Sequence, residues 1–218
     1  MKKFFKIAVI VFGIMFLLFF IIGLFSADSV SESNKTNTES ATIEVDSVQI
    51  KKDIKIKDSL ELVKKLKKES AEKQLKRFKK KVDEFNGTTF YTDTRAPKYT
   101  NVNFIYPYIG EKDNRYWLRL RFQYKADDWL FIKKGILLVD GDKYELTGSW
   151  ERDNGSGDIW EWLDIQVNPT QLQILNKIAN SESAKIRYEG TQYHNDRTIT
   201  AKEKSIIKTT LEIFDNLN

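Results

Sequence analysis

The sequence predicts an α+β fold: an antiparallel, β-rich domain with a sandwich-like sheet and two helices in its C-terminal half. A transmembrane helix, a linker and a basic amphipathic helix precede this domain. Residues 7–25 are uncharged and apolar, residues 116–125 and 159–167 alternate with a period of two, and helix-capping residues precede positions 169 and 201. A period of two is typical of pleated strands, and capping residues mark the first turn of a helix. We expect an anchor, a linker, a basic helix and a domain, at residues 1–26, 27–57, 58–86 and 87–218.

The apolar run comes first. Its nineteen residues would form a helix of about 28 Å, close to the hydrocarbon thickness of a bilayer. The run is longer than the core of a signal peptide, and a cut after Ala27 or Ser26 would place Phe25 or Leu24 where a small residue is required. We therefore favour an uncleaved anchor over a cleaved signal peptide, and residues 7–25 are the predicted contact with the membrane.

The basic residues that flank this run predict its orientation. Lys2, Lys3 and Lys6 precede it, whereas the twenty residues after it contain Lys35 among several acids. By the positive-inside rule the N-terminus is cytoplasmic and the C-terminal domain extracytoplasmic, in a single-pass protein of the cell membrane. The chain contains no cysteine, which excludes a lipid-modified cysteine and any disulfide.

The positive charge is not spread evenly. The net charge is +5, but residues 51–86 hold fourteen Lys or Arg against seven acids, and residues 87–218 hold eighteen against nineteen. A nucleic-acid-binding domain would need a basic face of its own. The nearly neutral domain argues against nucleic acid as a partner.

Residues 27–57 are interpreted as a flexible, mostly extended linker. Residues 27–41 are rich in Ser, Asn, Thr and acids and contain one large apolar residue, Val30, so they bury too little to offset the entropy of ordering. Short apolar and charged alternations follow up to Asp58. A strand that pairs onto the main domain is the alternative.

Residues 58–86 are predicted to form the basic amphipathic helix. The apolar residues that define its face are spaced three or four apart: Leu75, Phe78, Val82 and Phe85. Asn86-Gly87 is interpreted as the C-terminal stop. The apolar face is expected to pack on the following domain, and a dimeric coiled coil or contact with anionic lipid or cell-wall polymer are alternatives, so the oligomeric state is open.

Strands dominate from Thr88 onward. The alternating residues 116–125 and 159–167 are the clearest, and Asp140-Gly141 between apolar runs predicts a β-hairpin. Shorter predicted strands are residues 88–92, 103–108, 129–132 and 185–190. Two capping signals, Asn168 before Pro169 and the box from Thr200 to Glu203, predict the helices.

Several runs of the domain resemble a family of uncharacterised bacterial, often membrane-tethered, β-rich domains. The resemblance covers about residues 80–218 and is carried by residues 83–87, 117–121, 127–132, 159–162 and 193–200, which include Asn86-Gly87, Trp160 and His194. It implies a β-rich domain with a C-terminal helix. It implies no reaction, cofactor or site residue.

Three groups of residues are candidate sites of chemistry. His194, the only histidine, has no cysteine or serine elbow to complete a nucleophilic site, so a polar loop residue is favoured. Acidic residues near Gly155 and Gly157 miss the spacing of a calcium loop. Glu161 with Asp164 or Asp158 is a nominal glycosidase pair. No catalytic residue, metal site or cofactor is predicted.

The tryptophans of residues 159–167 are the better candidate. Trp160 and Trp162 share one strand face with Asp164 and Gln166, while the aliphatic residues face the other way. Either a helix covers the Trp face, or the face is a platform for a glycan or a partner protein.

These observations predict a membrane-anchored, extracytoplasmic binding or interaction module that is not an enzyme, with Trp160, Trp162, Asp164 and Gln166 as its ligand or partner platform. A structural subunit of an envelope complex and an exported hydrolase that uses acidic residues are the alternatives.

Overall fold

The strand with the most regular alternation lies at the centre of the main sheet. In the computed structural model, which describes residues 39–218 and their side chains from residue 53, β4 (Arg115–Ala126) pairs with β3 (Phe104–Lys112) on one side and with β8 (Asp158–Gln166) on the other. The sheet continues through β2 (Thr88–Thr92) to β1 (Lys79–Asp83), and through β8 to β7 (Glu151–Gly155). All its pairings are antiparallel, in the order β1-β2-β3-β4-β8-β7.

A second antiparallel sheet has the order β10-β9-β5-β6. Its strands are β5 (Lys134–Val139), β6 (Asp142–Thr147), β9 (Ala184–Glu189) and β10 (His194–Thr198). The predicted Asp140-Gly141 turn joins β5 to β6, and both of its residues have positive φ. The hairpin predicted from this dipeptide is confirmed.

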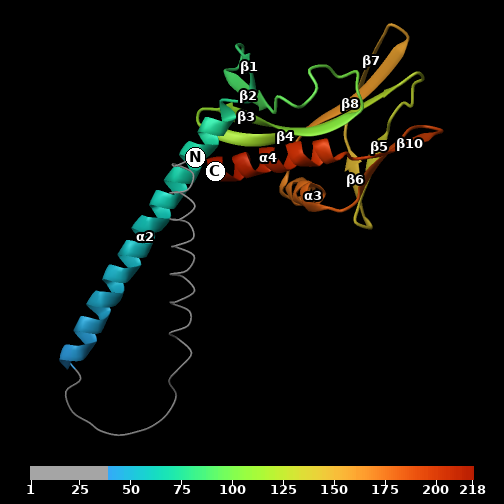
Figure 1. Ribbon diagram of the computed structural model, residues 1–218. Coiled ribbons are helices and arrows are strands. Elements are labelled where there is room, and N and C mark those ends of the chain that lie inside the picture. Colours follow the sequence, from blue (N-terminus) through green and yellow to red (C-terminus); the bar gives the residue numbers. More distant parts are fainter. Residues whose placement is uncertain (1–38) are drawn as a thin grey trace, which may run out of the picture. The chain divides into compact units, whose positions relative to one another are not determined.

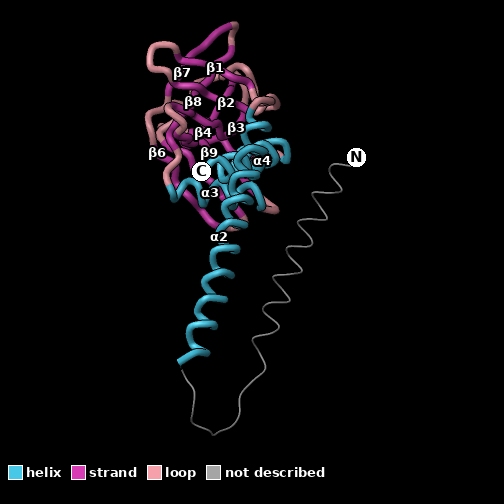
Figure 2. The backbone as a smooth tube through the Cα atoms, turned by 90° about the vertical axis from the view of Figure 1, so that its left-hand side faces the viewer, coloured by secondary structure: helices cyan, strands magenta, loops and turns pink. Residues whose placement is uncertain are grey.

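Both predicted helices are present and begin at their capping residues. Asn168 caps α3 (Pro169–Asn180) and Thr200 caps α4 (Ala201–Leu217), each with a complete capping box. Figure 1 shows α3 and α4 on the same side of the six-stranded sheet, and Figure 2 shows them side by side against the strands. The predicted α+β, β-rich antiparallel domain is therefore confirmed.

One hydrophobic core joins these elements. Ile105, Leu118 and Phe122 enter it from the first sheet, and Leu137 and Tyr188 enter it from the second. The helices contribute a further set of buried residues: Leu175, Ile178, Ile207, Leu211, Leu217, Ala71 and Leu75. Residues from Lys55 to Asn218 accordingly form one compact unit.

The prediction of a helix over residues 58–86 is wrong after Leu75. The helix α2 (Glu39–Leu75) ends at Leu75, and residues 79–83 form β1, which pairs with β2. Asn86-Gly87 closes this hairpin: the Asn86 side-chain oxygen accepts the Thr88 N–H, and Gly87 has a φ of 71°. The same dipeptide is both a helix stop and a hairpin turn, and here the β-forming residues 88–92 decide between them.

Because the helix ends at Leu75, the four residues of the predicted apolar face do not lie on one helix face. Leu75 is buried and Phe78 packs against the core, but Val82 and Phe85 are exposed. The short strand predicted at residues 129–132 is also wrong, because these residues do not form a strand.

The predicted linker is corrected in part. Residues 39–57 belong to α2 instead of being extended, since a helix that has already formed adds one hydrogen bond for each further residue at little cost. Residues 27–38 and the predicted transmembrane run 7–25 lie outside the described residues. Within residues 39–218 no helix has both the length and the apolar composition to cross a membrane.

Candidate ligand-binding face

The side of the six-stranded sheet opposite the main core carries aromatic and charged side chains, and Ile206 of α4 packs against one of them, Tyr106. Even-numbered residues of β4 face the core, and odd-numbered residues point the other way. Directly paired residues lie on the same face, so Arg121 shares its side with Tyr106 and Asp164, and Arg119 with Tyr108 and Gln166. We call this the arginine–tryptophan face, defined by Phe90, Tyr108, Trp117, Arg119, Arg121, Trp160, Trp162, Asp164 and Gln166.

All four residues of the predicted platform lie on this face. Trp160 and Trp162 are half-buried, and Gln166 is exposed. Their strand neighbours Ile159 and Leu163 are buried on the opposite side, where the helices pack. The predicted separation of the two faces of β8 is therefore observed.

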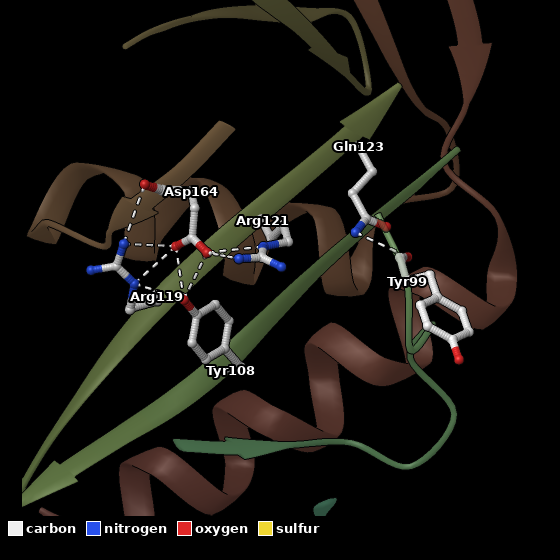
Figure 3. A network of polar contacts seen from close by, with 6 residues as sticks. All are labelled: Tyr99, Tyr108, Arg119, Arg121, Gln123 and Asp164. Carbon is white, nitrogen blue, oxygen red and sulfur yellow. Dashed lines mark hydrogen bonds and ion pairs between the residues drawn. The ribbon is translucent and has the colours of Figure 1, made fainter. Parts of the chain in front are cut away.

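Asp164 is the centre of a polar cluster on this face (Figure 3). Arg119 Nε donates to Asp164 Oδ1 at 2.8 Å, and Arg121 donates to Oδ2 through Nε at 2.9 Å and Nη2 at 2.6 Å. The Tyr108 hydroxyl donates to the same carboxylate at 2.7 Å and accepts from Arg119 Nε at 2.7 Å. Three neighbouring strands are thus joined through one carboxylate.

The charges of this cluster do not cancel. Burial lowers the pKa of Arg119 and Arg121, but Asp164 and the neighbouring tyrosines raise the pKa more, so both guanidinium groups stay protonated. Burial, followed by the negative charge of Asp164, raises the pKa of the Tyr108 hydroxyl, which stays neutral. Two positive charges therefore face one negative charge, and the arginine side chains are still 29% and 28% exposed.

Trp117 lies flat on the same face because of a glycine. A Cβ atom added at Gly110, the residue directly opposite on β3, would collide with the indole ring of Trp117. Phe90 of the next strand meets this ring edge-on at 6.5 Å between centroids. Because Gly110 has no side chain, Trp117 can pack flat on the sheet beside Phe90, at one end of the face.

The segment between β2 and β3 borders the face. Ala96 of this segment is buried against Tyr106, and the Tyr99 carbonyl accepts from Gln123 Nε2 at 3.4 Å (Figure 3). Arg95 holds the segment through a bidentate contact with the buried Asp93, with Nη2 to Oδ2 at 2.6 Å. The segment leaves Tyr99 63% exposed beside the arginine–tryptophan face.

The nominal pair of catalytic acids does not converge. Glu161 is fully buried on the core side of β8, whereas Asp164 and Asp158 lie at positions on the other side. Glu161 instead accepts the backbone N–H groups of Leu130, Phe131 and Ile132 at 3.0, 2.8 and 2.8 Å. It holds a segment in which Phe131 has a φ of 53°.

The other two candidate groups, the acids near Gly155 and Gly157 and the residues around His194, do not form a site either. Asp153 accepts its neighbour's backbone N–H and Asp158 pairs with Lys125; among the described residues no group of three or more His, Cys, Asp or Glu side chains could hold a metal ion. His194 is exposed at the start of β10, and Asp196 is engaged by Arg187 at 2.7 Å.

The platform predicted from the sequence does not include Arg119, Arg121 or Tyr108. Arg119 and Arg121 stand two apart in a recognised strand, so their common face was predictable. Their link to Asp164 was not, because β4 and β8 are separated by two strands of the other sheet and by β7.

Comparison with known proteins gives no match. No protein-family model fits the chain, and neither the curated proteins nor the solved structures include one that is significantly similar to it.

Proposed function

We propose that this protein is a membrane-anchored, extracytoplasmic binding module, and that its ligand lies on the arginine–tryptophan face. The observation that carries the proposal is the side of the sheet opposite the main core, where half-buried tryptophans lie on either side of partly exposed arginines. Large aromatic side chains and arginine are the residue types that contribute most to binding surfaces.

The arrangement supports binding over catalysis. Asp164 is held by two guanidinium groups, and Glu161 is turned into the core by three backbone hydrogen bonds. A general acid or base needs a site in reach of a reacting atom and a proton that can move. Neither carboxylate is placed for such work, so we assign the face to recognition.

The experiment is sedimentation of the full chain, in mild detergent, with envelope fragments of the cells that produce it. We expect Trp160→Ala with Trp162→Ala to reduce sedimentation about tenfold, as the loss of aromatic anchors does in other interfaces. Tyr193→Ala is the matched control, because this aromatic residue is 74% exposed at the far turn between β9 and β10. A double variant that melts cooperatively and sediments like the wild type would refute the platform.

A structural subunit of an envelope complex is the second candidate. Apolar side chains on α2 favour it, because six of them are at least 37% exposed: Ile54, Ile56, Leu60, Leu62, Val63 and Leu66. Exposed apolar surface of this kind commonly marks a protein contact. A fixed stoichiometry with another envelope protein in detergent extracts, lost on Leu60→Lys and retained on Lys64→Gln, would support this alternative.

A further inference from the structure

We propose that Arg119 and Arg121 form a subsite for the carboxylate of an acidic polysaccharide, whose sugar rings lie over Trp117 and Trp162. The inference rests on the proposed function, since it names the ligand class of the same face.

Arg119 has N–H donors beyond those that bind Asp164 and Tyr108, whereas Arg121 also hydrogen-bonds the Tyr106 hydroxyl. A guanidinium group has five N–H donors arranged as a fork that fits a carboxylate. Arg119 and Arg121 bind the Asp164 side chain through Nε and Nη2, so their Nη1 groups take no part in this contact. Asp164 and Tyr108 also fix the orientation of both side chains before a ligand arrives, which lowers the entropy cost of binding.

The charge of the cluster suits one anionic group. Two guanidinium groups and one carboxylate leave one positive charge at its centre. Lys125, further along the same face, is neutralised by Asp158 at 2.7 Å, and the exposed acids Glu151 and Asp153 of β7 lie beside Trp162 and Trp160, away from the arginines. A ligand that places a carboxylate at this point, between flat groups that pack on the tryptophans, therefore complements the face.

The aromatic residues indicate what the flat groups are. Trp162 of β8 pairs with Gln123 of β4, which lies six residues after Trp117, or about 20 Å along the strand. Arg119 and Arg121 lie between the two tryptophans. Pyranose rings present a C–H face that packs on an indole ring, as other flat apolar groups do. A polymer of sugar acids supplies rings and carboxylates together, whereas an acidic peptide or a polyol phosphate supplies charge without the rings.

The test measures binding of the full chain, in mild detergent, to immobilised polygalacturonate. We expect saturable binding that weakens about tenfold when the carboxylates are methyl-esterified, as for the loss of a charge-assisted bidentate contact. Equal binding of the esterified polymer would overturn the carboxylate subsite.

Variants locate the subsite. Arg119→Gln is expected to weaken binding about tenfold, and Arg187→Gln, which removes an exposed arginine that also pairs with an aspartate, is the matched control. Gln166→Glu tests the face without disturbing the fold, because Gln166 is exposed and lies opposite Arg119. Its added negative charge should weaken binding several-fold, and Gln173→Glu, at an exposed position of α3, should not. Equal effects of Gln166→Glu and Gln173→Glu would contradict this location.

Two further polymers separate the sources of negative charge. Polyglutamate that binds as tightly as polygalacturonate would identify an acidic peptide as the occupant, and tighter binding of poly(glycerol phosphate) would identify a phosphate polymer; either result overturns the proposal. If polygalacturonate does not bind although envelope sedimentation still depends on Trp160 and Trp162, the ligand class is wrong and the binding module stands. If polygalacturonate does not bind and envelope sedimentation does not depend on Trp160 and Trp162, both proposals are refuted.

Discussion

The carboxylate of Glu203 accepts the backbone N–H of Ile105 at 2.7 Å, although 98 residues separate them. Ile105 lies in the half of β3 that β2 does not reach, since β2 pairs only with residues 109–111. A helix side chain thus satisfies a donor at an open strand edge. The same carboxylate accepts from Arg197 Nη2 at 2.7 Å and from the Thr200 N–H at 2.7 Å, so it also completes the α4 capping box.

Removing this carboxylate should destabilise the domain strongly. Glu203→Ala leaves Arg197 and the Ile105 N–H without their acceptor in a buried position. We expect a loss of about 3–5 kcal/mol in the free energy of unfolding, as for other broken buried ion pairs. Denaturant unfolding measures it, with Glu212→Ala at an exposed site of the same helix as control. A loss that matches the control would mean that another group holds the strand edge.

Glu161→Gln should reveal the structural role of this acid. The amide retains one acceptor oxygen but turns an NH₂ group toward backbone donors, so at least one of three hydrogen bonds is lost. We expect a cost of about 2–3 kcal/mol for a buried donor left unsatisfied beside a polar group. Thermal melts compare this variant with Glu151→Gln, an exposed position of β7. Unchanged stability would contradict a role for Glu161 in holding residues 130–132.

The two faces of β8 should respond differently to truncation. Leu163 is 1% exposed in the core, so Leu163→Ala should cost about 2–5 kcal/mol. Trp160→Ala and Trp162→Ala remove half-buried rings from the other face and should cost clearly less. Thermal melting of each single variant measures the difference in stability between the two faces. Tryptophan variants that melt as low as the Leu163 variant would show that these rings are needed for folding.

The Asp93–Arg95 contact should make stability depend on acid pH. Burial by itself would raise the pKa of Asp93, but hydrogen bonds and charge from Arg95, with the charge of Lys79, outweigh burial and lower it below its ordinary value of 3.8. A lowered pKa in the folded state contributes stability above that ordinary value and loses it as the pH falls through the folded pKa. Asp93→Asn should therefore be less stable than the wild type at pH 7, with a gap that narrows below about pH 4. A gap that stays constant from pH 7 to pH 2 would contradict this linkage.

The lysines before residue 7 predict the side of the membrane on which the domain lies. Alkaline phosphatase fused after Asn218 should be active, because this enzyme requires an extracytoplasmic location to form its disulfides. A matched fusion in which Lys2, Lys3 and Lys6 are changed to Glu should lose activity. Activity of a cytoplasm-dependent reporter at Asn218 in the unaltered chain would reverse the orientation and refute the extracytoplasmic module.

Local signals in the sequence determined the strands, caps and turns that depend on neighbouring residues. Residues 116–125 and 159–167 alternate because each strand has a core side and an outer side, and Asn168 and Thr200 cap helices through side-chain oxygens that accept a backbone N–H three residues later. The same alternation placed Trp160, Trp162, Asp164 and Gln166 on one face. Such information lies within a few residues, so it can be obtained from one sequence.

Only the tertiary structure decided which strands became neighbours. Arg121 meets Asp164 across 43 residues, and that contact follows from placing β8 beside β4, which no local pattern specifies. Residues 79–83 have a helix-like spacing but pair with β2, because the hydrogen bonds of a sheet are made with another segment. Glu161 looked like a surface acid and is buried, since its partners are backbone groups about thirty residues away. The physical reason is the same in each case: long-range pairing and burial, which depend on the whole chain, outweigh the local preference of a few residues.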